Sequence, residues 1–175
     1  MIRLLEITKA NFERFQSSIV KIEQSSFPSP WSLNAFLEEI DRPISYLWAL
    51  LVEEALKAYI CFWIVSGEAH LMNIAVHPGR RRKGLGRLLL GRMIEFAKSK
   101  MIRVVWLEVR PSNVTARKLY EKMGFTETGR RPRYYTDTKE DAVIMCLPLY
   151  LIDTDWSGGS ESSDSQLFLI GFEKT

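Results

Sequence analysis

A single strand–helix–strand passage constrains the fold of this chain more than any other feature. An apolar, branched run over 69–76 is followed by an amphipathic helix pattern over about 85–100, and then by a second branched run over 103–109. Two strands separated by a helix need a crossover connection, so we expect them to pair in parallel. The chain therefore contains at least one parallel strand pair covered by a helix.

The segments before and after this passage are expected to add further strands, most of them antiparallel to their neighbours in the sheet. The expected elements are helices over 11–24, 32–40 and 112–124 and strands over 46–53, 56–65, 125–131 and 142–149. Ser112 is the expected cap of the last helix, and Gly124 ends it. The predicted fold class is α/β (α+β), with a mixed, mostly antiparallel central sheet flanked by helices.

The 175 residues of the chain fit one domain better than two. We place this domain over residues 1–150 and a flexible C-terminal tail over 151–175, because a Ser-, Gly- and acid-rich linker begins near Trp156. We expect the tail to be dispensable for catalysis. Cys61 and Cys146 lie in apolar, strand-like runs. They could pair, but two buried free thiols are favoured.

The sequence gives no sign of a membrane segment or a metal site. The first ten residues lack the apolar core of a signal peptide, and no apolar run approaches the ~20 residues of a membrane helix. No Cys-x-x-Cys or His-rich spacing indicates a metal site. These observations favour a cytoplasmic protein without membrane contact or bound metal.

Positive charge is concentrated in one loop, although the net charge is only +3. The basic residues of this region, with no acid among them, are Arg80, Arg81, Arg82, Lys83, Arg87 and Arg92. Such a cluster attracts an anion, although composition alone favours a solvated face. Direct nucleic-acid binding is disfavoured, because the charge is confined to one loop and no aromatic stacking platform surrounds it.

The same loop carries Gly84 and Gly86 at the expected start of a helix. Glycines let an anion approach the backbone closely, and the free amides of a helix start attract negative charge. This arrangement suits a phosphate group. The spacing is neither that of a Walker loop nor that of a dinucleotide-binding fingerprint. A glycine turn beside solvated arginines explains it equally well, so both interpretations stay open.

The motif Arg81-x-x-Gly84-x-Gly86, which follows Asn-Ile-Ala-Val, resembles the coenzyme A pyrophosphate loop of GNAT acetyltransferases. Other segments are similar to this family in order and spacing: 27–32 (Phe-Pro-Ser-Pro-Trp-Ser), 106–113 (Trp-Leu-Glu-Val-Arg-Pro-Ser-Asn), 116–125, 133–135 (Arg-Tyr-Tyr) and 140–142 (Glu-Asp-Ala). Over about residues 1–150 they resemble the RimI branch, the ribosomal-protein-alanine N-acetyltransferases. The resemblance implies the GNAT fold and acetyl-CoA as cosubstrate.

The resemblance also implies roles for individual residues. The backbone groups expected to hold the pantetheine arm of the cosubstrate are those of Ile74, Ala75 and Val76. The pyrophosphate is expected at Arg81, Arg82, Lys83, Gly84, Leu85 and Gly86. Asn113 and Tyr120 are expected to contact the cofactor arm. Glu108 is implied as general base and Tyr120 as general acid, and the residues implied to shape the acceptor site are Trp31, Tyr134 and Tyr135.

Each of these roles has an ordinary structural alternative. Glu108 could be a charged strand end, and Asn113 could merely begin a helix. Tyr120 lies on the apolar stripe of its helix, where a tyrosine is usually a core residue with a solvated tip. The side chains of Arg80, Arg82 and Lys83 are favoured as solvated steering charges rather than specific contacts.

The implied reaction is direct attack of an amine on acetyl-CoA in a ternary complex. The favoured acceptor is a protein N-terminus beginning with Ala or Ser, such as that of a small-subunit ribosomal protein. A terminal amine has an ordinary pKa of ~7.7–8.0, against ~10.4 for lysine, so less is needed to deprotonate it. The alternatives are acetylation of a lysine or a small amine, and a non-catalytic acetyl-CoA-binding module, which would need neither Glu108 nor Tyr120. We expect a monomer or weak dimer.

Overall fold

The computed structural model describes residues 1–149 and 172–173. In chain order the elements are β1 (Ile2–Glu6), α1 (Lys9–Gln24), α2 (Leu33–Asp41), β2 (Ser45–Val52), β3 (Ala55–Val65), β4 (Glu68–Val76), the short 3-10 helix η1 (Pro78–Arg80), α3 (Leu85–Ser99), β5 (Val104–Val109), α4 (Val114–Lys122), β6 (Thr126–Arg131), β7 (Ala142–Pro148) and β8 (Phe172–Glu173). The expected order of helices and strands is therefore confirmed from α1 to β7.

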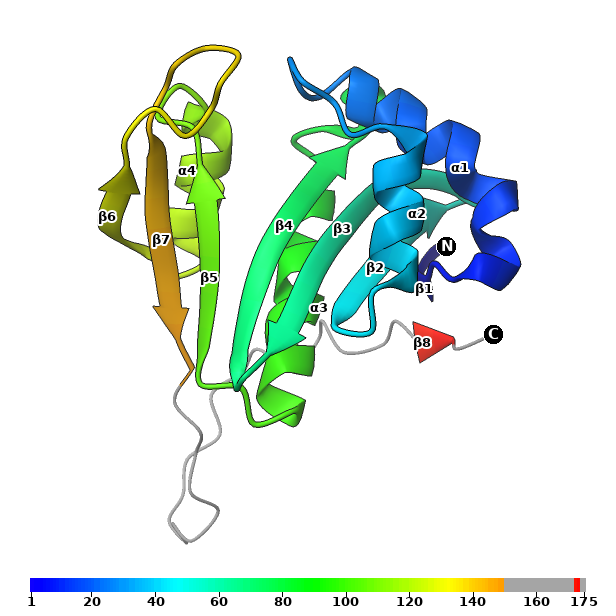
Figure 1. The fold of residues 1–175 in the computed structure, drawn as a ribbon. Coiled ribbons are helices and arrows are strands. Elements are labelled where there is room, and N and C mark those ends of the chain that lie inside the picture. Colours follow the sequence, from blue (N-terminus) through cyan, green and yellow to red (C-terminus); the bar gives the residue numbers. More distant parts are fainter. Residues whose placement is uncertain (150–171, 174–175) are drawn as a thin grey trace, which may run out of the picture.

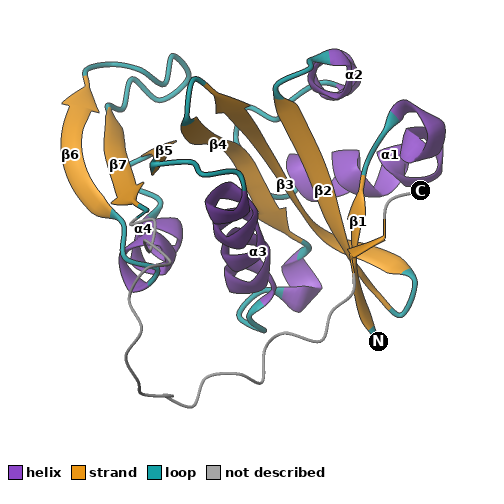
Figure 2. Ribbon diagram, turned by 90° about the horizontal axis from the view of Figure 1, so that it is seen from below, coloured by secondary structure: helices purple, strands orange, loops and turns teal. Residues whose placement is uncertain are grey.

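The strands form one sheet in the order β6-β7-β5-β4-β3-β2-β1-β8. β4 pairs with β5 in parallel, as the crossover through α3 requires, and β1 pairs with β8 in parallel. The other neighbouring strands are antiparallel. Helices α1 and α2 cover one face of the sheet, and α3 and α4 cover the other (Figure 2). The predicted mixed, mostly antiparallel sheet flanked by helices is confirmed.

The central strands are apolar on both faces because both faces are covered. Along β2, Trp48 and Leu50 belong to the core under α3, whereas Leu47, Ala49 and Leu51 belong to the core under α1 and α2. Successive side chains of a strand point to opposite faces, so a run without polar residues fits a strand buried on both sides. This is why β2 and β3 are continuous apolar runs in the sequence.

Tight turns join the three central strands. Glu53 and Glu54 connect β2 to β3 with φ angles of 53° and 62°, and Ser66 and Gly67 connect β3 to β4 with φ angles of 52° and 79°. Two successive residues with positive φ are typical of the type I′ hairpin, whose twist matches that of the flanking strands. The expected hairpin between the first two of these strands is confirmed.

The sheet opens between β4 and β5. The two strands pair only from Glu68 to Leu71 on β4, opposite Val104 to Leu107 on β5, and then diverge toward their carboxyl ends (Figure 1). The divergence coincides with a bulge in β4: Cys61 of β3 pairs with Asn73 and Phe62 with Leu71, so Met72 is the extra residue. A bulge bends its strand, and this one directs the end of β4 away from β5.

Two expectations about the fold were wrong. The N-terminal ten residues contain β1, which was not predicted, because the five residues Ile-Arg-Leu-Leu-Glu carry little periodicity. Pairing with β2, from Ile2 opposite Val52 to Glu6 opposite Trp48, forms this strand. The cap of α4 is Asn113, not Ser112: the Asn113 side chain accepts a hydrogen bond from the amide of Ala116.

The two ends of the chain meet at the edge of the sheet. Phe172–Glu173 pairs with Leu4 and Leu5 of β1, inside the segment expected to be a tail. The linker expected from Trp156 lies outside the described residues, and the boundary near residue 150 stays a prediction. Cys61 and Cys146 are free and buried, as favoured. In the described residues, no helix is long and apolar enough to cross a membrane.

Candidate active site

The basic loop between β4 and α3 presents backbone amides at the start of a helix. Gly84 is the N-cap residue of α3, with φ at 81°, in the left-handed region that favours glycine. A Cβ atom added at Gly84 would meet no heavy atom within 4 Å, so the backbone there is open to a ligand. The free amides of the first turn and the positive end of the helix dipole face this space, which therefore fits a pyrophosphate.

Gly86 has a different environment from Gly84. A Cβ atom added at Gly86 would lie 3.5 Å from Leu119 Cδ2 of α4 and 3.7 Å from Val76 Cγ2 of β4. Its missing side chain therefore faces the protein and lets the first turn of α3 pack closely on β4 and α4. A larger residue at position 86 would push these elements apart, whereas a larger residue at position 84 would strain the cradle itself.

The guanidinium of Arg81 fixes the basic loop to the rest of the protein. Its Nε donates to the carbonyl oxygen of Val76 at 3.1 Å, and its Nη2 donates to the carbonyl oxygen of Ser25 at 3.1 Å and to Ser26 Oγ at 3.0 Å. The side chain thus joins the end of α1 to the end of β4. Arg82 and Lys83 are exposed.

The opening between β4 and β5 leaves the predicted pantetheine edge of β4 opposite the strand that carries Glu108. Beyond the bulge, Ile74, Ala75 and Val76 pair with β3 on one edge but are not paired with β5 on the other. Glu108 is the first residue of β5 past the paired segment. The backbone edge that is free to bind a pantetheine arm therefore faces the strand that carries the predicted base.

Glu108 lies among charged and phenolic partners. Its Oε1 is 3.0 Å from Nη1 of Arg131 on β6, and the Tyr134 hydroxyl donates a hydrogen bond to its carboxylate. The side chain of Glu108 is 26% exposed, so solvent and an incoming acceptor can reach it. Arg131 and Tyr134, from one stretch of the chain at the end of β6, thus meet the carboxylate of Glu108 on β5.

Tyr120 is buried in α4, with its ring 5.9 Å from that of Phe125. Burial raises the pKa of its hydroxyl, and the nearby Tyr135 adds to the increase. Burial also raises the pKa of Tyr135 to about 12, against the opposing effect of Arg110. The hydrogen bond to Glu108 is the largest cause of the raised pKa of Tyr134. All three phenols are protonated at neutral pH and can donate a proton or a hydrogen bond.

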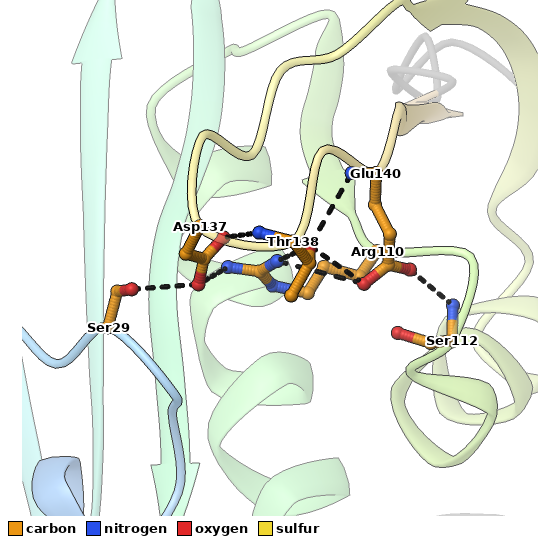
Figure 3. Close-up of polar contacts among 6 residues, drawn as sticks. All are labelled: Ser29, Arg110, Ser112, Asp137, Thr138 and Glu140. Carbon is orange, nitrogen blue, oxygen red and sulfur yellow. Dashed lines mark hydrogen bonds and ion pairs between the residues drawn. The ribbon is translucent and has the colours of Figure 1, made fainter.

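A polar network that the sequence did not predict joins three loops around this cluster (Figure 3). Arg110, at the end of β5, stacks its guanidinium 3.8 Å above the ring of Tyr135. The same guanidinium contacts Asp137 Oδ2 at 2.8 Å and Thr138 Oγ1 at 2.6 Å in the β6–β7 loop. Asp137 Oδ2 in turn accepts from Ser29 Oγ at 2.7 Å, in the loop between α1 and α2.

The network extends to the loop before α4. Glu140 Oε2 accepts from the Ser112 amide at 3.1 Å, and its Oε1 lies 3.7 Å from Arg110. Hydrogen bonds from Ser29 and Arg110 lower the pKa of Asp137 to about 2, and contacts with Ser112, Thr138 and Arg110 lower that of Glu140. The network therefore holds two carboxylates in their charged form, with Arg110 as the cation between them.

Two predicted site residues have other contacts in the structure. Trp31 packs on Phe36 at 5.4 Å between ring centroids, and its backbone amide donates to Glu23. Asn113 uses its side chain as a helix cap, so a bond from that side chain to a cofactor would compete with the cap. Their predicted roles stay predictions. Arg110 could have been found from the segment 106–113, but nothing in the sequence marks Asp137.

Comparison with known proteins identifies the family. The model of the acetyltransferase (GNAT) family matches residues 17–125. The [ribosomal protein bS18]-alanine N-acetyltransferase of Escherichia coli K12 is 41% identical over 131 residues, which cover 73% of this chain and 87% of that protein. The enzyme of the same name from Haemophilus influenzae is 38% identical over 149 residues, covering 82% and 97%.

The solved structures agree with this relationship. The crystal structure of the ribosomal-protein-S18-alanine N-acetyltransferase from Escherichia coli matches with a TM-score of 0.78 and 33% identity, over 90% of this chain and 100% of that one. The chain belongs to the GNAT acetyltransferase family, in the branch that these ribosomal-protein-alanine N-acetyltransferases represent.

Proposed function

We propose that this enzyme transfers the acetyl group of acetyl-CoA to the α-amine of the N-terminal alanine of ribosomal protein bS18. What supports this proposal is the unpaired edge of β4 opposite Glu108, together with the glycine cap that opens the start of α3. Relatives of about 40% identity act on that protein by name, which supports the choice of acceptor.

The cosubstrate would lie in the opening of the sheet. The amides at the start of α3 would bind the pyrophosphate, and the free edge of β4 from Ile74 to Val76 would bind the pantetheine arm. When bound, acetyl-CoA supplies the thioester carbon that an amine can attack and a thiolate that can leave. No covalent enzyme intermediate is needed, because both groups are held side by side.

Glu108 would accept the proton that the acceptor amine loses. The ordinary pKa of an α-amine is ~7.7–8.0, so a substantial fraction is neutral near pH 7.5 and one carboxylate, acting through a water molecule, suffices. As the new C–N bond forms and the C–S bond breaks, the excess proton leaves the nitrogen toward Glu108. Arg131 and Tyr134 orient that carboxylate beforehand.

Tyr120 would donate a proton to the leaving thiolate. Its raised pKa keeps the hydroxyl protonated, and burial beside Phe125 fixes the direction of the ring. The hydrogen bond matters most when negative charge develops on sulfur, so it lowers the barrier more than it improves binding.

The test is a competition among peptides that differ only at the N-terminus. One peptide begins with free Ala, one with Ser, one with Met, and one with acetyl-blocked Ala followed by an internal lysine. We expect kcat/KM to be highest for the Ala peptide and the blocked peptide to be unmodified. Acetylation of the blocked peptide at the rate of the free one would overturn the proposal in favour of a lysine acetyltransferase.

A further inference from the structure

The structure contains a buried carboxylate that the reaction does not use. Glu23, in the last turn of α1, is only 1% exposed. Its Oε1 accepts from the Trp31 amide at 2.8 Å, its Oε2 accepts from the Tyr59 hydroxyl, and Asn73 Nδ2 lies 3.3 and 3.2 Å from its two oxygens. We call Glu23, Trp31, Tyr59 and Asn73 the Glu23 cluster.

Several contributions to the free energy disfavour a carboxylate at this position. Burial removes it from water and raises its pKa, which the three hydrogen-bond donors oppose. The negative end of the α1 dipole adds to the unfavourable energy. In the described part of the chain, no Lys, Arg or His lies within ion-pair distance of Glu23. An apolar residue of similar volume would often be as stable here, so stability alone does not account for the carboxylate.

The Glu23 cluster connects two parts of the proposed site. Trp31 lies in the loop between α1 and α2, whose Ser29 contacts the β6–β7 loop beside Glu108. Asn73 follows the bulge at Met72, where β4 leaves β5, and immediately precedes Ile74 of the proposed pantetheine edge. Glu23 therefore fixes the distance between the loop on the acceptor side and the strand on the cosubstrate side.

A second buried carboxylate, Glu39, shows what a purely structural counterpart looks like. It lies in the last turn of α2, is 9% exposed and, like Glu23, contacts β3. Its partners are Arg42, Ser45 and Trp63, with Cys61 Sγ farther away at 3.9 Å. They lie at the end of α2, at the start of β2 and on β3. Glu39 is also a buried carboxylate at the end of a helix, but it pairs with Arg42 and joins no element of the proposed site.

We propose that Glu23 is a positioning residue that holds the acceptor loop, residues 25–32, in register with the thioester-binding edge of β4. The proposal rests on the proposed acetyl transfer. Glu23 touches neither substrate; its carboxylate sets how far the bound α-amine lies from the thioester carbon. A misplacement of about 1 Å can lower a rate by about 100-fold, so small movements of this loop affect turnover.

The test compares Glu23→Gln with Glu39→Gln in the full chain. Glutamine accepts through one oxygen only and turns an NH2 group toward the donors, so the loop is no longer held. For Glu23→Gln we expect the acceptor-peptide KM to rise about tenfold and kcat to fall severalfold, with the Kd of acetyl-CoA changed less than twofold. For Glu39→Gln we expect all three to stay within twofold of wild type, although both variants lose thermal stability.

Amide hydrogen exchange gives a readout that does not depend on activity. Protection of the Trp31 amide should fall in Glu23→Gln, because one glutamine oxygen is left for three donors. It should persist in Glu39→Gln, because Glu39 does not contact Trp31. If Glu23→Gln does not fold, Tyr59→Phe removes one donor from the cluster and should raise the acceptor KM about threefold with reduced Trp31 protection. Wild-type KM and protection in whichever variant folds would overturn the proposal.

Failure of the proposed function is distinguishable from failure of this inference. A wild-type protein that does not acetylate the Ala peptide would refute the acceptor, and the loss or persistence of Trp31 protection in Glu23→Gln would still decide whether Glu23 holds the loop. Equal losses of activity in Glu23→Gln and Glu39→Gln would identify both residues as structural and overturn the positioning role.

Discussion

The proposed cosubstrate side and the proposed acceptor side of the site are built in different ways. The proposed cosubstrate side comes from one continuous stretch, β4 to the start of α3, and presents mainly backbone groups. The acceptor side is assembled from side chains of three separate segments: Ser29 and Asp137 are 108 residues apart, and Asp137 and Arg110 are 27 apart. Backbone recognition tolerates changes of neighbouring side chains, whereas the acceptor side depends on each of its side chains.

Tyr120 is the proposed general acid, and its substitution should have the largest effect. Phenylalanine keeps the ring packing against Phe125 and removes only the proton donor. We expect Tyr120→Phe to lower kcat about 100-fold with little change in either substrate's affinity, since general acids typically contribute at least this much. Single-turnover kinetics with excess acetyl-CoA measures the chemical step. A wild-type single-turnover rate would make Tyr120 a packing residue.

Gly84 allows a test of whether backbone groups at the start of α3 bind acetyl-CoA. Gly84→Val forces a branched residue into the left-handed region and fills the open cradle. We expect the Kd of acetyl-CoA to rise about tenfold, or about 1.4 kcal/mol, with the acceptor KM unchanged. Calorimetric titration with acetyl-CoA gives the Kd.

The matched control for this glycine lies in the same helix. At Gly91 an added Cβ would meet only Met123 Cε, at 3.9 Å. Gly91→Ala should therefore bind acetyl-CoA normally and gain about 0.5–1 kcal/mol of stability, because alanine is the better helix former. Equal weakening of binding in Gly84→Val and Gly91→Ala would show that the cradle is not at the start of α3.

Arg110 allows a test of whether side-chain contacts support binding of the acceptor peptide. Lysine keeps the charge but loses the planar stacking on Tyr135 and the forked contact with Asp137 and Thr138. We expect Arg110→Lys to raise the acceptor KM about fivefold, with the Kd of acetyl-CoA unchanged. The control is Arg117→Lys, whose ion pair with Glu127 at 3.7 Å lies outside the network. A larger change in the Kd of acetyl-CoA than in the KM of the acceptor peptide would contradict the division between the two sides.

Ser29 should give the smallest effect. Ser29→Ala removes one hydrogen bond to Asp137 at a partly solvated position, so we expect the acceptor KM to rise only about twofold. The pKa of Asp137 is lowered to about 2 from its ordinary 3.8, so the contribution of this carboxylate is fully present above about pH 4 and is lost as pH falls toward 2. The ratio of variant to wild-type KM should therefore be flat from about pH 6 to 9. A marked slope in that range would assign the contact to a different titrating group.

The local features of the fold were predictable because they depend on neighbouring residues. The apolar stripe of α3 predicted a helix, and the continuous apolar runs of β2 and β3 predicted strands, as the structure confirms. β1 was not predictable, because its five residues are ordered by pairing with β2, some fifty residues later. The cap of α4 was placed one residue early, since Ser112 and Asn113 are both good cap residues and only the geometry selects between them.

The sequence alone determined the parts of the site that lie close together along the chain. The glycine loop, the strand before it and the helix after it form a local unit, and family resemblance added Glu108 and Tyr120. Only the tertiary structure decided the rest. Glu23 meets Tyr59 and Asn73, 36 and 50 residues away, and Arg110 meets Asp137 because β5 and the β6–β7 loop converge. The sequence shows which polar side chains are present, but their partners depend on how the sheet bends and opens.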